Sequence, residues 1–433
     1  MPEAHHEAPP AAGTRAATGT RKAGQAGAAG RPGDPHAARL AGELARGAVD
    51  DLPRGALQER LESVRAEGRP LRVKLGIDPT APDIHLGHAV VLGKLREFQD
   101  AGHTVVLIIG DFTARVGDPS GRSSLRPILS EQEIEANAAT FQDQAMRILS
   151  ADPQHLEVRR NSEWLDMRAT DLLALMRTAT AAQLLEREDF AKRFAANEPI
   201  SMLELLYPLL QGYDSVAVQA DVELGGTDQK FNLLFARDIQ RAYGRPMQAI
   251  LTMPILVGTD GTRKMSKSLG NQIGVTDPPQ EMYGKTMSIP DDAMAAYYRL
   301  LLGHEPPAGV QQGASAARDA KRELARALVA WLHSEADADA AQEHFDRVIV
   351  AREEPAEVAE LRFSCEDGLV HLPELIAREF DVSRSEARRL IEQGAVSLGG
   401  RALASGEHDI PCAQADGATL RVGRRRYARL RMQ

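Results

Sequence analysis

A predicted buried strand leads directly into a helix that carries two histidines in its first turn. The strand is the apolar run Leu71–Ile77, whose continuous apolar character is typical of a strand inside a parallel sheet. The helix begins near His85 and His88, which frame Gly87. A helix N-terminus presents unpaired backbone N–H groups and a partial positive charge, and both favour a bound phosphate. This corner therefore predicts an α/β fold with an anion site beside the two imidazoles.

The two histidines alone do not establish such a site. Residues three apart share one face of a helix, so His85 and His88 can both donate to phosphate oxygens. Gly87 leaves room for a ring or a phosphate to approach the helix backbone. Histidines at this spacing are also often capping or surface residues, so the interpretation needs a second motif.

A polar loop farther along the chain supplies that motif, with the sequence Lys264-Met265-Ser266-Lys267-Ser268. On its own, a glycine-flanked loop with two lysines is usually a solvated basic turn. A His-Leu-Gly-His corner followed by a Lys-Met-Ser-Lys-Ser loop is, however, the paired HIGH and KMSKS signature of class I aminoacyl-tRNA synthetases. From about Leu71 to the C-terminus, the chain resembles a tyrosyl-tRNA synthetase of the bacterial branch with an intact lysine loop and a C-terminal S4-like domain.

The resemblance implies an α/β protein with three folded parts. These are a Rossmann-type parallel-sheet catalytic domain, an α-helical anticodon-binding domain and a small α+β S4-like RNA-binding domain. The N-terminal segment has almost no large apolar residue, so it is expected to be disordered. The predicted divisions are 1–37 for this tail, 38–262 for the catalytic domain with its insertion, 263–356 for the lysine loop and helical domain, 357–368 for a linker and 369–433 for the S4-like domain.

Several segments outside the two motifs carry their own structural predictions. Thr104–Ile109 has the β-branched, apolar pattern of a central parallel strand, and Arg39–Glu67 is predicted to be largely helical. A strand at Leu156–Arg160 and helices near 170–185 are expected to form an insertion between the two halves of the sheet. The apolar helices of that insertion fit a buried core or a dimer surface equally well. A further helix is predicted over Ile200–Asp214.

Cysteine usage and hydropathy bear on the compartment. The chain has 433 residues, and Cys365 and Cys412 are its only cysteines. Two cysteines without a Cys-x-x-Cys pattern argue against a disulfide framework and against a structural zinc site, and they fit a reducing cytosol. No apolar run reaches the length that crosses a bilayer. The sequence therefore predicts a cytoplasmic protein without a membrane partner.

The charge of the chain is distributed unevenly. The net charge of −9 by itself argues against nucleic-acid binding. Residues 369–433, however, hold 11 arginines against 8 acidic residues, and residues 421–431 contain six arginines and no acid. A local basic patch can hold phosphates on an acidic protein. Together with predicted short helices at Leu372–Phe380 and Ser383–Gln393, this pattern resembles an S4-type RNA-binding domain, and the alternative is a basic tail that aids solubility.

The reaction implied by the resemblance is activation of tyrosine with ATP to tyrosyl-adenylate, then transfer of tyrosyl to the 3′-terminal ribose of tRNA(Tyr). The attacking carboxylate is already an anion, so the first step needs no general base. Positioned donors must instead stabilise the negative charge on phosphorus and on the departing pyrophosphate. Mg²⁺ is expected to accompany the nucleotide, although no dedicated carboxylate cage is visible. A homodimer is also expected from the resemblance.

Carried over residue by residue, the resemblance assigns four sets of residues and no metal ligand. The catalytic set is His85, His88, Thr80, Lys264 and Lys267. The ATP-binding set is Asp78, Gly87, Gly226, Asp228 and Ser268, with Arg122 and Arg126 as candidates for the pyrophosphate. The tyrosine-binding set is Tyr207, Gln211 and Asp118 at the ammonium, Asp214 at the phenol, Gln229 close by, and Lys74. The RNA-binding set is Arg384, Arg388, Arg389, Arg424, Arg425 and Arg426.

Lys74 marks a departure from the better-known branch of the family. That branch has a tyrosine four residues before the aspartate of the Asp-Pro-Thr segment, where this chain has Lys74. The tyrosine of that branch helps to bind the substrate phenol. Another group near Asp214 is therefore expected to share this role here.

Three other functions share part of the pattern. A tryptophanyl-tRNA synthetase has the same fold and motifs, but the S4-like tail and Asp214 favour tyrosine. A nucleotidylyltransferase also binds ATP with His-x-Gly-His, yet it would not explain the lysine loop or two RNA-facing domains. An RNA-binding protein descended from a synthetase would show erosion of one motif, and neither motif is eroded.

Overall fold

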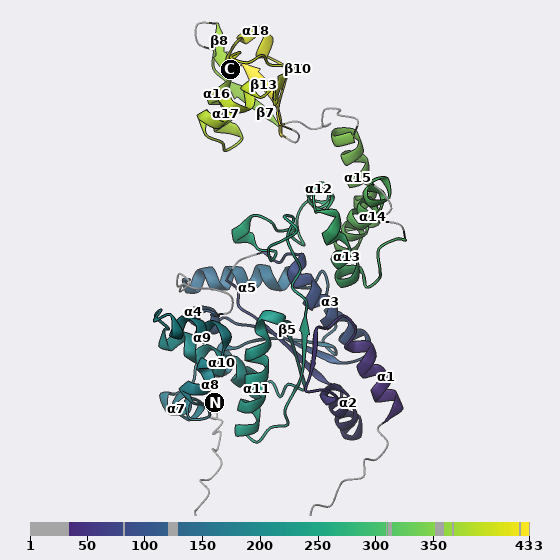
Figure 1. Cartoon of the computed structure of the whole chain (residues 1–433), viewed down its shortest axis with the longest axis vertical. Helices are drawn as coiled ribbons and strands as arrows, with labels where there is room; N and C mark the ends of the chain where they lie inside the picture. The colour runs from purple at the N-terminus through teal and green to yellow at the C-terminus, as the bar shows by residue number, and fades with distance from the viewer. Residues whose placement is uncertain are drawn as a thin grey trace, which may run out of the picture.

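Figure 1 shows the computed structural model of the chain. The structure describes residues 34–80, 83–119, 129–308, 310, 314–350, 359–365, 368–423 and 426–432. Within these ranges, none of the helices combines the length and the apolar character needed to cross a membrane.

A six-stranded sheet forms the centre of the larger part of the molecule. Its strands are β1 (Asp50–Leu52), β2 (Arg72–Ile77), β3 (Thr104–Ile109), β4 (Leu156–Arg160), β5 (Val222–Gly226) and β6 (Ala249–Met253), in the order β1-β6-β5-β2-β3-β4. The pairs β2–β3, β3–β4, β2–β5 and β5–β6 are parallel, and only β1 runs antiparallel to its neighbour. The chain moves outward from β2 in one direction and later outward from β5 in the other, so the two adjacent strands form a topological switch point. Ligands of open α/β sheets bind outside the carboxyl ends of the strands at such a point.

Helices cover both faces of this sheet (Figure 1). The helices of this part are α1 (Pro35–Leu44), α2 (Ala56–Glu67), α3 (Leu86–Asp100), α4 (Thr113–Val116), α5 (Glu131–Ala145), α6 (Ser162–Leu165), α7 (Ala169–Met176), α8 (Ala181–Leu185), α9 (Glu188–Ala195), α10 (Met202–Ala217) and α11 (Lys230–Ala242). The predicted strands and helices of the sheet domain are confirmed within a few residues. The predicted tail is corrected at one end, because α1 starts at Pro35 and its buried side chains pack into the main core.

One prediction for the sheet is confirmed with an addition, and another is wrong. The segment Arg39–Glu67 is largely helical, as predicted, and it also contains β1 between its two helices, because Val49 and its successors pair with β6. A three-residue edge strand flanked by helices leaves no periodic signal in the sequence. The strand Leu156–Arg160 is not part of an insertion, since it pairs in parallel with β3 and extends the main sheet. The insertion consists of the helices that follow, α6 to α9.

The helical segment after the sheet shares the core of the sheet domain. It comprises the 3₁₀ turns η2 (Lys267–Leu269) and η3 (Asp291–Ala293), the helices α12 (Pro279–Met287), α13 (Met294–Tyr297), α14 (Ala314–Leu332) and α15 (Glu335–Phe345), and the π-helical turns η4 (Tyr298–Leu302) and η6 (Asp346–Val350). One contiguous apolar cluster runs from α1 through the sheet to Ala341. The hydroxyl of Tyr297 donates to the carbonyl of Val257 at 2.8 Å and fastens the two parts together.

The C-terminal part has its own core of buried apolar residues. It holds a five-stranded sheet, ordered β10-β9-β12-β13-β7, and a β11-β8 pair. Its elements are β7 (Glu360–Phe363), β8 (Leu369–His371), α16 (Leu372–Glu379), α17 (Arg384–Glu392), β9 (Val396–Leu398), β10 (Arg401–Ala402), β11 (Asp409–Pro411), α18 (Cys412–Ala415), β12 (Thr419–Val422) and β13 (Arg426–Met432). The linker predicted over 357–368 needs correction, because β7 pairs with β13 and belongs to this domain.

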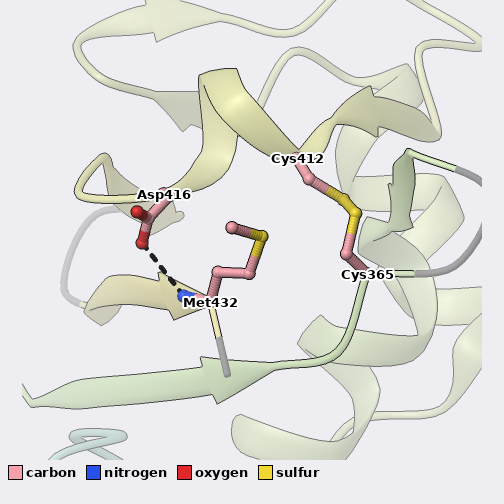
Figure 2. The surroundings of a disulfide bond; sticks show 4 residues. All are labelled: Cys365, Cys412, Asp416 and Met432. Carbon is pink, nitrogen blue, oxygen red and sulfur yellow. Dashed lines mark hydrogen bonds between the residues drawn. A yellow bond between two sulfur atoms is a disulfide. The ribbon is translucent and has the colours of Figure 1, made fainter.

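A disulfide joins Cys365 to Cys412 across this domain (Figure 2). The expectation of no disulfide framework is thus wrong for this pair. The two residues are 47 positions apart, and their Cα atoms lie 6.1 Å from each other. The antiparallel pairing of β8 with β11 brings their segments together. This long-range pairing cannot be read from cysteine spacing.

Candidate active site

A cavity of about 650 Å³ lies at the carboxyl ends of β2 and β5. Both sequence motifs contribute to its wall, as do the ends of the central strands. Fifteen of the predicted catalytic, nucleotide and tyrosine residues line it: Asp78, Thr80, His85, Gly87, His88, Asp118, Tyr207, Gln211, Asp214, Gly226, Asp228, Gln229, Lys264, Lys267 and Ser268.

The histidine corner and the segment after the lysine loop are joined by backbone hydrogen bonds. The N–H of Leu86 donates to the carbonyl of Ile273 at 2.9 Å, and that of Val275 donates to the carbonyl of Ile84 at 2.9 Å. A Cβ on Gly87 would lie 3.7 Å from the Cβ of Met265, whose side chain is buried. The two motifs are therefore neighbours in the folded chain, although nearly 180 residues separate them.

The two imidazoles stack with their ring centroids 4.0 Å apart. The backbone N–H of His85 donates to Nδ1 of His88 at 3.3 Å, so the neutral His88 ring carries its proton on Nε2. Burial, the neighbouring His88 and the charge of Lys264 together lower the pKa of His85 to about 2, and burial with the charge of Lys264 lowers that of His88 to about 4. At neutral pH both rings are uncharged, and each offers one N–H donor. A Cβ on Gly87 would lie 3.0 Å from the His85 ring. Glycine at position 87 therefore also avoids a close contact with this imidazole.

The lysine loop is fastened at its base and presents its two ammonium groups to carboxylates. The backbone N–H of Ser266 donates to Oδ1 of Asn271 at 2.8 Å. Lys264 Nζ lies 2.5 Å from Oδ2 of Asp228, and Lys267 pairs with Asp83. Both acidic partners line the cavity. The two cations are therefore held at the cavity by carboxylates with which a bound polyanion would compete.

Asp78 is fixed by two hydroxyl groups at the end of β2. The hydroxyl of Thr113 donates to Oδ1 at 2.6 Å, and that of Tyr207 donates to Oδ2 at 2.9 Å. Burial and the anions around it, Asp78 and Asp118 first, raise the pKa of Tyr207 well above its usual value. The phenol therefore stays protonated and remains a donor throughout the physiological range.

Asp214 lies at the deep end of the cavity, one helical turn beyond Gln211. The indole Nε1 of Trp164 donates to its Oδ1 at 2.8 Å. Burial raises the pKa of Asp214 to about 6, and the positive charge of Lys74 opposes that shift. Above about pH 6 the carboxylate can accept a hydrogen bond from a ligand hydroxyl, and below it the group becomes protonated.

Asp118 and Gln229 lie next to each other in the wall of the cavity. The amide Nε2 of Gln229 donates to Oδ2 of Asp118 at 2.7 Å. Asn232 donates to Oε1 of Gln229 at 3.1 Å, and Arg187 lies 3.9 Å from Asp118. Helix α11 and the insertion thus place these two predicted residues together.

Gly225 and Gly226 at the end of β5 lie very close to neighbouring side chains. A Cβ on Gly226 would lie 2.6 Å from Oδ1 of Asp228, and one on Gly225 would lie 3.1 Å from the side chain of Gln229. No larger residue fits without moving these side chains.

Lys74 does not line the cavity. Its side chain is fully buried, and its Nζ lies 2.8 Å from Oε1 of Glu223 on the adjacent strand. The ammonium also donates to the carbonyl of Gln211 at 3.0 Å and to the hydroxyl of Ser215 at 2.8 Å. All three donors of the ammonium therefore have partners inside the protein, so Lys74 supports the wall from behind.

The remaining predicted residues fall in other places. Arg122 and Arg126 lie outside the described residues, as do Arg424 and Arg425. Exposed on the C-terminal domain are Arg384, Arg388, Arg389 and Arg426. Arg384 pairs with Glu374 and Arg389 with Glu386.

Several residues that shape the site were missed from the sequence. These are Asp83, Thr113, Asn161, Trp164, Ser215, Glu223 and Gln248. Asn161 and Trp164 follow β4 directly, and the position after a parallel strand was a usable signal. Glu223 lies two residues before the predicted glycine corner. Its pairing with Lys74 depends on strand register and has no local signal.

Comparison with known proteins identifies the class. Residues 66–349 match the family described as tRNA synthetases class I (W and Y), so the chain belongs to this family. The tyrosine–tRNA ligase of Moorella thermoacetica is 48% identical over 89% of this chain and 94% of that protein. The corresponding ligase of Thermotoga maritima is 50% identical over 86% of this chain and 93% of that protein. Within the class, the chain belongs with the tyrosyl-tRNA synthetases.

Solved structures of the same kind share the fold. The tyrosyl-tRNA synthetase of Archaeoglobus fulgidus complexed with L-tyrosine is 25% identical, with a TM-score of 0.55 over 71% of this chain and 99% of that one. A truncated mitochondrial tyrosyl-tRNA synthetase of Aspergillus nidulans is 21% identical, with a TM-score of 0.58 over 72% of this chain and 98% of that one. The latter likeness concerns the fold.

Proposed function

We propose that this cavity activates tyrosine with ATP to tyrosyl-adenylate and then passes tyrosyl to the 3′-terminal ribose of tRNA(Tyr). The observation that carries the proposal is the convergence of the histidine corner and the lysine loop on one cavity, whose far end holds Asp214, Tyr207 and Gln211. A phosphate-binding end and an amino-acid-binding end in one cavity are what adenylate formation requires.

The proposed roles follow from position and charge. Tyr207, Gln211 and Asp118 hold the ammonium of tyrosine, and Asp214 accepts the phenolic hydroxyl. Thr80, Asp78, Gly87, Gly226, Asp228 and Ser268 hold the nucleotide. The tyrosine carboxylate attacks the α-phosphorus, the bond to the pyrophosphate breaks, and the pyrophosphate leaves with the electron pair. The N–H groups of His85 and His88 and the ammonium groups of Lys264 and Lys267 stabilise the charge that builds up.

The second step is a transfer between two oxygens. The ribose hydroxyl at the 3′ end of tRNA attacks the carbonyl carbon of the adenylate, AMP leaves with the electron pair of the broken bond, and the hydroxyl proton is released to solvent. We place tRNA on the helical segment and on the C-terminal domain, where exposed arginines gather. Arg122 and Arg126 stay candidates for the pyrophosphate.

Mg²⁺ is proposed to enter with ATP. Among the side chains that the structure describes, no three His, Cys, Asp or Glu residues come together as a metal-binding group. The carboxylates nearest the lysines, Asp83 and Asp228, are already paired with ammonium groups. These residues therefore fit a metal that is held by the phosphates of the nucleotide, where it would neutralise the leaving group.

Tyrosine-dependent exchange of pyrophosphate into ATP tests the proposal. The purified protein with tyrosine, ATP and Mg²⁺ is expected to incorporate labelled pyrophosphate into ATP, and tryptophan is expected to give no exchange above background. Because Asp214 is a buried acceptor and phenylalanine offers it no hydroxyl donor, phenylalanine should react far more slowly. Exchange that depends on tryptophan, or that needs no amino acid, would exclude the tyrosine assignment.

We also propose a cytoplasmic homodimer that pairs through the insertion and the start of α10. Phe194 and Met202 are 65% and 67% exposed, and Leu173 and Leu203 are also exposed. Large apolar side chains gathered on neighbouring helices of a protein surface usually mark an interaction site. A second copy of the chain is the occupant that fits a synthetase of this kind.

Charges placed on that surface are expected to separate the subunits. The double substitution Phe194→Asp and Met202→Asp should convert a dimer into a monomer in sedimentation equilibrium at micromolar concentration, because buried carboxylates without partners oppose association. Val49→Asp is the matched control, since Val49 is 58% exposed and directly precedes β1, which lies at the opposite edge of the sheet from β4. A wild-type protein that sediments as a monomer would refute the dimer.

A further inference from the structure

The most completely buried ion pair next to the active site has no role in the chemistry described so far. Lys74 on β2 and Glu223 on β5 are direct neighbours in the parallel register of the two strands. Their side chains are 0% and 1% exposed, and Nζ lies 2.8 Å from Oε1. Burying two charges is costly, and a well-packed apolar pair is often at least as stable. A role beyond stability is therefore worth seeking in what the pair contacts.

Glu223 is surrounded by donors. Its Oε1 accepts from Nε2 of Gln211 at 3.2 Å, and its Oε2 accepts from the hydroxyl of Ser215 at 3.0 Å and from Nε2 of Gln248. Lys74 in turn donates to the main-chain carbonyl of Gln211 and to the hydroxyl of Ser215. The pair thus forms hydrogen bonds with both the main chain and the side chain of Gln211 on α10, one turn before Asp214.

The contact with Gln211 determines which way its amide faces. A carboxylate only accepts hydrogen bonds, so the NH₂ group of Gln211 must face Glu223. The other end of the amide, Oε1, is then turned away from Glu223, and it has no partner among the residues that the structure describes. Gln211 lines the cavity. This oxygen is buried in the wall of the cavity and has no donor there among the described residues, so it suits a ligand ammonium, whereas an NH₂ group in its place would repel one.

We propose that Glu223, held in place by Lys74, is a positioning residue that fixes the amide of Gln211 as an acceptor for the ammonium of the amino-acid substrate. The inference rests on the proposed function, and it deepens it by explaining why Lys74 stands where another branch of the family has tyrosine. Glu223 also lines the cavity, and in this proposal the pair acts through Gln211. Through Gln211, the Lys74–Glu223 pair favours substrates that carry an α-ammonium group.

The decisive substitution is Glu223→Gln. The introduced amide has one acceptor oxygen in place of two, for which the ammonium of Lys74, the hydroxyl of Ser215 and the NH₂ groups of Gln211 and Gln248 compete. The amide of Gln211 is then no longer fixed and can turn its NH₂ group towards the substrate. We expect KM for tyrosine in pyrophosphate exchange to rise roughly 10- to 100-fold, the loss of a hydrogen bond to a charged group. KM for ATP and kcat at saturating tyrosine should stay within about threefold, because the nucleotide end is unchanged.

A tyrosine analogue without the ammonium separates this role from a general loosening of the site. The competitive inhibitor 3-(4-hydroxyphenyl)propanoate keeps the phenol and the carboxylate. Its inhibition constant should change less than about threefold in Glu223→Gln, while KM for tyrosine rises. An equal weakening of both ligands would overturn the proposal, because a merely structural role predicts that result.

Two further variants keep the test valid if the single substitution disturbs folding. Lys74→Met with Glu223→Leu removes both charges and should fold, since apolar replacement of a whole buried pair is often tolerated. With no acceptor for its NH₂ group, Gln211 loses its fixed orientation, so KM for tyrosine should stay raised although the melting temperature recovers. Asp221→Asn is the control, because Asp221 is a buried carboxylate paired with Arg60 and Arg69 just before the same strand, and it should leave KM for tyrosine unchanged.

The outcomes distinguish this inference from the function itself. If the wild-type protein shows no tyrosine-dependent exchange, the proposed function fails and takes the inference with it. If the wild-type protein exchanges normally and Glu223→Gln and the double variant both keep the wild-type KM for tyrosine, only the positioning role is refuted.

Discussion

Replacing Lys267 with alanine is expected to slow tyrosyl-adenylate formation by roughly 10²- to 10³-fold, the usual effect of losing one positioned donor at a developing charge. Lys267 opens the 3₁₀ turn η2, and its half-exposed ammonium pairs with Asp83. Both residues line the cavity. A lysine on a glycine-flanked loop can leave its carboxylate partner and follow the phosphates when ATP binds. The negative charge that grows on the departing pyrophosphate then loses its stabilising partner in the variant.

Single-turnover formation of the adenylate measures this effect, and equilibrium dialysis measures tyrosine affinity. The dissociation constant for tyrosine should stay close to wild type, because Tyr207, Gln211 and Asp214, which we propose hold the amino acid, all lie on α10. Lys192→Ala is the matched control, since Lys192 forms an exposed pair with Glu188 on one helix. A parallel loss of tyrosine affinity in Lys267→Ala would show that the loop holds the site together and has no specific part in the chemistry.

The histidine corner was predictable because its signals are local. An apolar strand, a glycine and a helix start follow one another in the sequence, and the structure places β2 and α3 where the pattern puts them. The lysine loop was predictable as a motif, although its contact with the corner was not. That contact runs through backbone pairing of the corner with Ile273 and Gly274, and backbone pairing between distant segments leaves no trace in side-chain identity.

The surroundings of Lys74 show where sequence reasoning reaches its limit. Its side chain belongs to a strand whose residues are buried on both faces, so alternation cannot say which side it takes. The partner Glu223 is set by the register of β2 against β5, which follows from the packing of the whole sheet. The resemblance placed Lys74 at the substrate. In the structure Lys74 lies behind the wall of the cavity, and Gln211 stands between Lys74 and the cavity. A charged residue in an otherwise apolar central strand was the available signal for a buried partner.

The C-terminal boundary failed for a related reason. Residues 360–363 form β7, which joins the sheet only through β13 at the far end of the domain. A strand that pairs across some 70 residues looks like a linker in the sequence. The helices α16 and α17 were found because their capping and periodicity are local.

Deleting residues 359–433 is expected to leave tyrosine-dependent pyrophosphate exchange within about twofold of wild type. By contrast, KM for tRNA in aminoacylation should rise by about 100-fold or more, because two or more charge-assisted phosphate contacts are lost. The removed segment has a core of its own, and the catalytic cavity draws no residue from it. The deletion must begin before β7, because a cut at Leu369 would leave that strand without its sheet.

Two point substitutions locate the RNA contact within that domain. Arg388 and Arg426 are exposed and have no acidic partner among the described residues, unlike Arg401, which pairs with Glu407. Arg388→Ala with Arg426→Ala should weaken tRNA binding and reduce the slope of log K against log salt by roughly 1.5, because each lost phosphate contact removes roughly 0.7 to 0.9 from the slope. Arg401→Ala should leave the slope unchanged, since the carboxylate already neutralises that guanidinium. If the full deletion charges tRNA as well as the intact chain, the arginines serve solubility, and tRNA must be held by the helical segment and the catalytic domain alone.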